Sequence, residues 1–244
     1  MAVSSLVSEV STTSAQSHEV AFLPILGHDL RSPLTALKGR LQLLHKRLGR
    51  QPGRDADVLD IQRMMYHVER ISHHLDIVRD ASQLLHGEFT LVRAQTDLVT
   101  LLRRVAGPYD HASSHGRVVI ETGGEPIVGY WDGERIAHAL NALIANGLRF
   151  GAEGSAVVVR AWRDGGCARI DVIDDGIGVP EMDREAIFQL GRRGSNAEQR
   201  GGAGLGLFVA REVIMQHGGQ VSMRPRPEGG SVFAVSLPLE QYQH

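Results

Sequence analysis

Leucine spacing predicts a long helix near the start of the chain. Apolar residues recur in alternating steps of three and four between residues 23 and 48, which is the spacing of a coiled-coil seam. A turn at residues 49–57 separates this segment from a second apolar helical stripe, from Val58 to Leu85. Two helices with a short connection predict an antiparallel hairpin, and a hairpin alone leaves part of each seam uncovered. We therefore expect a homodimer in which two hairpins form a four-helix bundle.

The hydrophobic period changes after Gly87. Short strand-like segments are now mixed with longer segments of helical spacing. Because strands and helices do not strictly alternate, the pattern predicts an α+β fold in which an α/β sandwich has a mixed sheet with helices on one face. The expected strands are 89–93, 117–121, 126–130, 155–163, 167–173, 219–224 and 231–237, and the expected helices are 97–106, 132–149 and 205–217.

These patterns divide the chain of 244 residues into three parts. Residues 1–18 are rich in Ser and Thr, which predicts a flexible leader. Residues 19–86 contain the hairpin, and residues 87–244 contain the α/β sandwich. We expect the hairpin to be the dimerisation domain.

Composition narrows the class of protein. The formal net charge of −2 provides no general attraction for nucleic acid or for an anionic membrane. No apolar run reaches the roughly 18 residues that a membrane span needs, and the first 20 residues do not resemble a signal peptide. The lone Cys167 excludes an internal disulfide framework. We expect a cytoplasmic protein that has no membrane span in this chain and no nucleic-acid partner.

His28 is the first residue with candidate chemistry. At about 100° per residue it lies near 200° from the neighbouring seam leucines, so its imidazole is expected to face solvent. The adjacent Asp29 can hold the imidazole tautomer or accept its proton. A lone helical histidine is most often an ordinary surface residue. Ordinary surface positions are also expected for His67, His73 and His74.

Two glycines follow a predicted strand in the segment Asp174-Asp175-Gly176-Ile177-Gly178. Glycines allow the backbone to adopt conformations that let a planar ligand approach closely. The Asp174 carboxylate can accept a hydrogen bond from an exocyclic amine such as that of adenine. A glycine turn without any ligand accounts for this short motif equally well.

A second glycine cluster, Gly201-Gly202-Ala203-Gly204-Leu205-Gly206, opens the helix expected at 205–217. Helix N-termini bind anions through free N–H groups and the helix dipole, so this segment is a candidate phosphate site. It is neither a Walker loop nor a dinucleotide fingerprint, because the required lysine and glycine spacing are missing. A flexible loop is the alternative.

Asn146 lies among apolar neighbours in the helix expected at 132–149. A buried amide without a partner costs about 1–3 kcal/mol, so its position suggests a ligand contact. Its carbonyl oxygen suits Mg²⁺, which prefers oxygen ligands. Arg149 follows three residues later on nearly the same face and can reach a phosphate.

The string His28-Asp29-Leu30-Arg31-Ser32-Pro33-Leu34-Thr35 resembles the phosphoacceptor motif of bacterial two-component sensor histidine kinases. The four motifs match that family's order and spacing from about residue 20 to residue 240. The last three are shared with the wider ATPase family of gyrase and Hsp90-type chaperones, so only the histidine string selects the kinases. The resemblance implies that His28 accepts the γ-phosphoryl group of ATP. It also implies that Asp29 is the base and that Ser32 supports dephosphorylation.

The same resemblance implies an ATP site with bound Mg²⁺ in residues 87–244. Asn146 would hold the metal, Asp174 would recognise adenine, and Gly176 and Gly178 would shape the base pocket. The ATP lid would extend from about residue 189 to residue 203. Further nucleotide-binding residues implied by the resemblance are Arg149, Arg193, Gly202, Gly204, Leu205 and Gly206.

The implied partners are a response regulator receiver domain, whose aspartate receives the phosphoryl group, and a separate sensor or upstream partner. The sequence departs from the family where a first Asn is usual, because that position is Ala142. One helical residue is about 100° of rotation, so Asn141 does not simply replace it. Gly191 replaces an aromatic residue, and Gly147 replaces an alanine. The alternatives are a non-catalytic regulatory scaffold with weak or no ATP turnover, and a plain ATPase.

Overall fold

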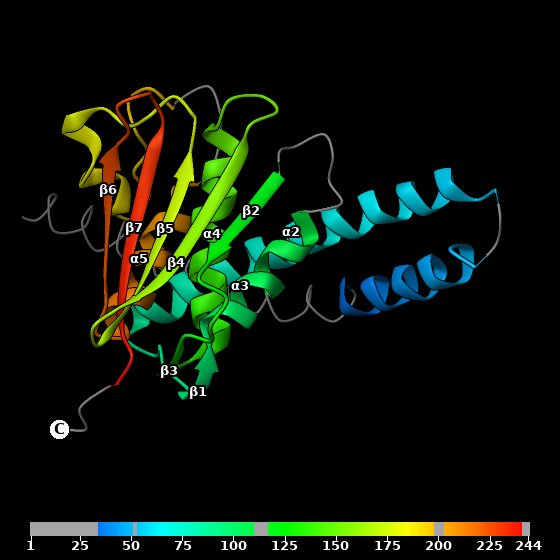
Figure 1. The fold of residues 1–244 in the computed structure, drawn as a ribbon, viewed down its shortest axis with the longest axis horizontal. Helices are drawn as coiled ribbons and strands as arrows, with labels where there is room; N and C mark the ends of the chain where they lie inside the picture. The colour runs from blue at the N-terminus through cyan, green and yellow to red at the C-terminus, as the bar shows by residue number, and fades with distance from the viewer. Residues whose placement is uncertain (1–33, 51–52, 110–116, 198–202, 241–244) are drawn as a thin grey trace, which may run out of the picture.

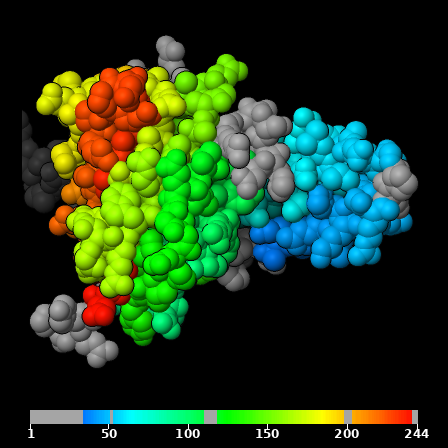
Figure 2. Space-filling model, in the orientation of Figure 1, coloured from blue at the N-terminus to red at the C-terminus, as the bar shows by residue number. Residues whose placement is uncertain are grey.

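The computed structural model describes residues 34–50, 53–109, 117–197 and 203–240. A helical hairpin projects from one side of an α/β part, as the ribbon and the space-filling view both show (Figures 1 and 2). The hairpin consists of a helix over residues 34–48 and of α2 (Asp55–His86). None of the described helices has the length and apolar character needed to cross a membrane.

The two hairpin helices pack against each other through seam residues that are seven positions, or two helical turns, apart. Leu41 and Leu48 of the first helix are buried in one cluster with Ile61 and Val68 of α2. An ion pair of 2.6 Å between Lys38 Nζ and a Glu69 carboxylate oxygen also joins the helices. Helix α2 ends at Gly87, whose left-handed backbone (φ 70°) lets its N–H cap the last turn.

The sheet of the α/β part has five strands in the order β2-β4-β5-β7-β6. Strands β2 and β4 are parallel and every other neighbouring pair is antiparallel, so the sheet is mixed. A separate antiparallel pair joins β1 to β3. The elements are β1 (Ala94–Asp97), α3 (Leu98–Ala106), η1 (Gly107–Tyr109), β2 (Arg117–Thr122), β3 (Val128–Trp131), α4 (Gly133–Phe150), β4 (Ala156–Asp164), β5 (Cys167–Asp174), η2 (Glu181–Asp183), η3 (Ala186–Phe188), α5 (Gly206–Gln216), β6 (Gln220–Pro225) and β7 (Ser231–Pro238).

The core lies between one face of this sheet and helices α3, α4 and α5 (Figure 1). Helix α4 supplies apolar side chains at helical spacing, and β5 and β7 supply them mainly at alternate positions. Phe233 of β7 is fully buried in this core. Other fully buried members of the same cluster include Ile136, Leu140, Leu143, Ile144, Ile170 and Ile214.

The α+β prediction is therefore confirmed, and the three helices of the α/β part lie within one residue of their expected bounds. The strand expected at 89–93 is wrong, because the first described strand begins at Ala94. Residues 89–93 are tied down by side chains instead of a strand partner. The Val92 N–H donates to a carboxylate oxygen of Asp132 at 2.8 Å.

Asp132 connects three segments at the start of α4. Its carboxylate accepts the N–H groups of Arg135 and Val92, so it is both the helix cap and an anchor for the incoming chain. Its own N–H donates to His217 Nε2 at 3.0 Å. The other ring nitrogen of His217 donates to the Val213 carbonyl at 2.7 Å. Burial lowers the pKa of His217, which keeps the ring neutral for this pair of bonds.

We expect Asp132→Ala to lower the free energy of unfolding by about 1–2 kcal/mol, because two backbone donors lose their acceptor. Glu134→Ala is the matched control, since Glu134 is exposed and pairs with the exposed Arg104. Its effect should stay below about 1 kcal/mol. Denaturant unfolding at neutral pH measures both, and equal losses would contradict the anchoring role of Asp132.

Candidate functional site

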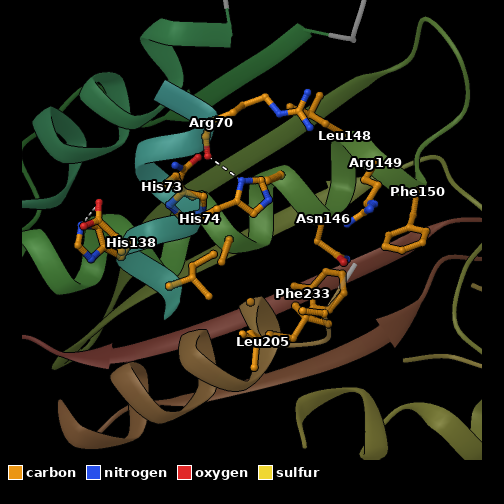
Figure 3. A pocket seen from close by; sticks show the side chains of 18 of the residues that line it. Arg70, His73, His74, His138, Asn146, Leu148, Arg149, Phe150, Leu205 and Phe233 are labelled. Atoms are coloured by element: carbon orange, nitrogen blue, oxygen red, sulfur yellow. Dashed lines mark hydrogen bonds and ion pairs between the residues drawn. The ribbon is translucent and has the colours of Figure 1, made fainter. Parts of the chain in front are cut away.

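A cleft of about 1020 Å³ lies where α4, the end of β5, the segment around residues 191–197 and the start of α5 meet. Its opposite wall comes from the hairpin. Figure 3 shows His73 and His74 on α2 across from Asn146 and Arg149 on α4. The cleft therefore combines the two parts of the chain.

Asp174 ends β5 at the cleft and is 3% exposed. The Gly176 N–H donates to its Oδ1 at 2.9 Å. Burial raises the pKa of Asp174 above its ordinary value, although hydrogen bonds from the Gly176 and Ser231 backbone act in the opposite direction. A desolvated carboxylate with backbone partners can accept a further hydrogen bond from a ligand amine.

Glycines allow the backbone to pack closely around Asp174. A Cβ at Gly176 would lie 2.2 Å from the Phe150 carbonyl oxygen, and Gly178 has a φ of 66°. A Cβ at Gly147 would lie 3.0 Å from Val157 and 3.5 Å from the Asp174 side chain. Gly147 thus lets α4 approach the sheet beside Asp174, which gives a packing reason for this departure from the family.

Asn146 is half-buried on α4 and lines the cleft, and Arg149 lines it from a more exposed position. Asn141 also lines the cleft, but its side chain is already bonded within the chain. Its Oδ1 accepts the Tyr109 hydroxyl at 2.5 Å, so it does not take the place of the missing first Asn. Ala142, which holds that place, is buried, and its Cβ would lie 3.7 Å from a Cβ at Gly206.

The described ends of the expected lid lie close together. Gly191 and Gly204 both have positive φ, and the Gly191 N–H donates to the Gly204 carbonyl at 3.2 Å. A side chain at Gly204 would meet the backbone of residues 191 and 192. The positive φ at Gly191 explains why an aromatic side chain is unfavourable there. Arg193 is exposed in this segment and lines the cleft.

Helix α5 begins at the cleft with Leu205 as its N-cap and no side-chain capping bond. The first N–H groups of a helix have no partner within the helix. Leu205, Gly206 and Leu207 line the cleft, and this start of α5 therefore has the geometry of an anion site.

The structure brings most of the predicted nucleotide residues to one cleft. Gly176 lies just behind the lining, where it donates to Asp174. His28, Asp29, Ser32 and Gly202 lie outside the described residues. Within the described part of the chain, no cluster of three or more His, Cys, Asp or Glu residues could hold a metal ion. The predicted residues in the lining are Asn146, Arg149, Asp174, Gly178, Arg193, Gly204, Leu205 and Gly206.

The hairpin wall of the cleft was not predicted. His73, which was expected on the surface, is 8% exposed, and its Nε2 has no hydrogen-bond partner. Burial, together with nearby His138 and His74, lowers the pKa of His73 to about 3. Periodicity indicates which positions share a face of α2, but it does not reveal that a distant domain covers that face. No signal in the sequence identified this wall.

Residues 131–241 match the family described as "Histidine kinase-, DNA gyrase B-, and HSP90-like ATPase". The chain is 32% identical over 219 residues to the alginate biosynthesis sensor protein KinB of Pseudomonas aeruginosa, covering 87% of this chain and 36% of that protein. It is 35% identical over 218 residues to the sensor histidine kinase GtrS of Pseudomonas aeruginosa, covering 87% of this chain and 40% of that protein. The chain belongs with the bacterial two-component sensor histidine kinases. It spans well under half the length of these two relatives.

Solved histidine kinase structures share the fold. The crystal structure of full-length ShkA in complex with AMPPNP matches with a TM-score of 0.60 and 25% identity, over 91% of this chain and 46% of that one. The catalytic domain of the histidine kinase ThkA matches with a TM-score of 0.55 and 24% identity, over 62% of this chain and 99% of that one. Residues 131–241 thus have the fold of a histidine kinase ATPase domain.

We expect Gly176→Ala to weaken ATP binding by about tenfold or more, because the new methyl group forces apart the Phe150 carbonyl and the turn beside Asp174. Gly166→Ala is the control, since a Cβ there would meet nothing within 4 Å. Titration calorimetry with ATP measures both variants. Unchanged affinity in Gly176→Ala would show that this turn does not shape the nucleotide site.

Proposed function

We propose that this chain is an ATP-dependent protein histidine kinase that phosphorylates His28 and passes the phosphoryl group to an aspartate of a response regulator. The proposal includes dephosphorylation of that regulator with the help of Ser32. It also includes the division into a leader at 1–18, a dimerisation and phosphoacceptor domain at 19–86, and a catalytic domain at 87–244. The cytoplasmic location and the separate upstream sensor stay predictions.

One observation carries this proposal. Thr35 and Lys38 of the first hairpin helix line the same cleft as Asp174 and Asn146. Thr35 is the last residue of the string that contains His28. The described end of that string and Lys38 therefore line the same cleft as the proposed nucleotide residues, which supports phosphotransfer within this chain.

The residues of the cleft suit the different parts of ATP. The buried Asp174 carboxylate can accept the adenine amine, and the uncapped start of α5 can bind phosphate oxygens. Arg149 and Arg193 line the cleft with positive charge. Catalysis by such a site is mainly positioning and charge neutralisation.

In the proposed step, a bond forms between an imidazole nitrogen of His28 and the γ-phosphorus. The bond from that phosphorus to the bridging oxygen breaks, and ADP leaves. Asp29 accepts the imidazole proton. Mg²⁺, when bound, neutralises phosphate charge, and Asn146 is the residue that would hold it through its amide oxygen.

A homodimer is supported by an apolar stripe that the hairpin leaves exposed. Leu37 and Leu44 are 45% and 42% exposed, and Met64 and Ile71 are 52% and 50% exposed. In both helices the stripe lies three residues after the buried seam. Because the helices are antiparallel, that equal offset turns both stripes to the same side of the hairpin. A second hairpin would cover this side and complete a four-helix bundle.

Incubation with γ-labelled ATP should place acid-labile, alkali-stable label on the wild-type chain. His28→Gln should abolish the label and leave ATP affinity unchanged, because His28 reacts with the nucleotide without holding it. Asp174→Ala should reduce ATP affinity by about tenfold or more, because the acceptor for adenine is lost. Quantified gels and titration calorimetry provide the two measurements.

Other outcomes separate the alternatives. Absence of label on the wild type despite ATP binding would favour a non-catalytic scaffold. ATP turnover that is the same in wild type and His28→Gln, without label, would favour a plain ATPase. Either result would overturn the kinase proposal.

We expect a double variant, Leu44→Glu with Ile71→Glu, to halve the molecular mass in solution, because it places carboxylates on the apolar stripe. The monomer mass is 26.6 kDa. Leu43→Glu is the control, since Leu43 is 70% exposed and lies about 100° around the first helix from Leu44. Light scattering after size exclusion measures the mass. A wild-type monomer, or a control that dissociates equally, would refute the stripe as the dimer contact.

A further inference from the structure

Helix α2 meets the ATPase domain through a cluster of buried charge. Asp80 is 0% exposed, and its carboxylate contacts the Arg135 guanidinium and lies 3.0 Å from His138 Nδ1. Asp76, one turn earlier, lies 3.4 Å from His138 Nε2. We call these four residues the α2–α4 junction. They belong to none of the motifs in the sequence.

We propose that Asp80 is a positioning residue that holds the ATPase domain against the hairpin and so sets the width of the nucleotide cleft. This inference rests on the proposed function for its catalytic consequence. The contact itself joins segments that are 55 positions apart in the chain. Arg135 has two further contacts: it donates to Gln83 Oε1 at 2.7 Å, and its Cζ lies 4.5 Å from the centroid of the Phe89 ring.

The electrostatics support a specific anchor. Burial alone would raise the pKa of Asp80, but the His138 hydrogen bond and the charges of Arg135 and Arg79 lower it below the ordinary value. Asp80 is therefore an anion whose burial depends on its cationic partners. Arg79 lies on α2 itself, so the partners that dock the two domains are those on α4.

The junction also has the composition of a contact that can open. Its charged groups become hydrated when the two helices separate, which offsets part of the cost of exposing the apolar contacts of Ile77 and Ala81. His73 lies beside it as a buried imidazole with an unpartnered Nε2, which makes the docked state less favourable. The contacts of Asp80 with Arg135 and His138 offset that cost, so the docked arrangement depends on Asp80.

The junction is connected to the cleft through Ile77, which lies on α2 about one turn before Asp80. Its Cδ1 would lie 3.8 Å from a Cβ at Gly206, the first residue of α5. Helix α2 in turn holds the first hairpin helix through Glu69 and Lys38. A shift of α2 on α4 therefore moves Lys38 and Thr35 relative to the start of α5. Misplacement of reacting groups by about 1 Å can cost about 100-fold in rate.

The test compares Asp80→Asn with Asp80→Glu and with Asp60→Asn in the full chain. Asp60 is an exposed residue of α2 that pairs with Arg63 on the same helix, so its variant is the matched control. At saturating ATP, Asp80→Asn should slow labelling of His28 by about tenfold or more, with ATP affinity within about threefold of wild type. Asp80→Glu should recover part of the rate.

Hydrogen–deuterium exchange provides a readout that does not depend on catalysis. Asp80→Asn should speed exchange in residues 72–86 and 133–139 and leave β4 and β5 unchanged. A double variant with Arg135→Gln should be no slower in labelling than Asp80→Asn alone, because both changes break one contact.

Exchange rates in Asp80→Asn that equal those of the wild type would overturn the proposal. Faster exchange throughout the ATPase domain would also overturn it, because that result indicates general destabilisation. Faster exchange at the junction with an unchanged or higher labelling rate would overturn the positioning role. If the wild-type chain is never labelled, the kinase proposal fails, and the exchange comparison still decides whether Asp80 holds the domains together.

Discussion

Helix α4 buries Ile136, Leu140 and Leu143 in the core, and that packing fixes the position of the functional groups that α4 itself carries. With this face fixed, the helix presents Asn146 near its end to the cleft and His138 near its start to α2. The close approach at Gly147 brings the same helix next to Asp174. One buried face therefore orients both the nucleotide site and the contact with the hairpin.

Two buried carboxylates, Asp174 and Asp80, have opposite pKa shifts because their surroundings differ. Asp174 has backbone donors for partners, so burial dominates and its pKa is raised. Asp80 has cationic partners, so its pKa is lowered despite complete burial. The first retains capacity to accept a ligand hydrogen bond. The second is already satisfied by the chain and serves to hold two domains together.

Each helix of the hairpin has two apolar stripes, one buried against the other helix and one exposed. Leu41 and Leu48 close the contact within the chain, and Leu37 and Leu44, each three residues after a seam leucine, leave a second apolar stripe. The C-terminal part of α2 extends beyond the contact with the first helix, and its Ile77 and Ala81 pack in the core of the ATPase domain. A change of helix position in a dimer would therefore be transmitted directly to the cleft.

The sequence by itself determined the hairpin, the mixed sheet and the position of the glycine-rich turns, because these depend on local periodicity and on backbone freedom. It also indicated Asn146 and Asp174, since an amide or a carboxylate beside apolar or glycine residues is a local signal. Only the tertiary structure decided that α2 walls the cleft, that His73 is buried and that Asp80 meets Arg135. Those contacts join segments far apart in the chain, and periodicity within one helix carries no information about which distant surface it meets.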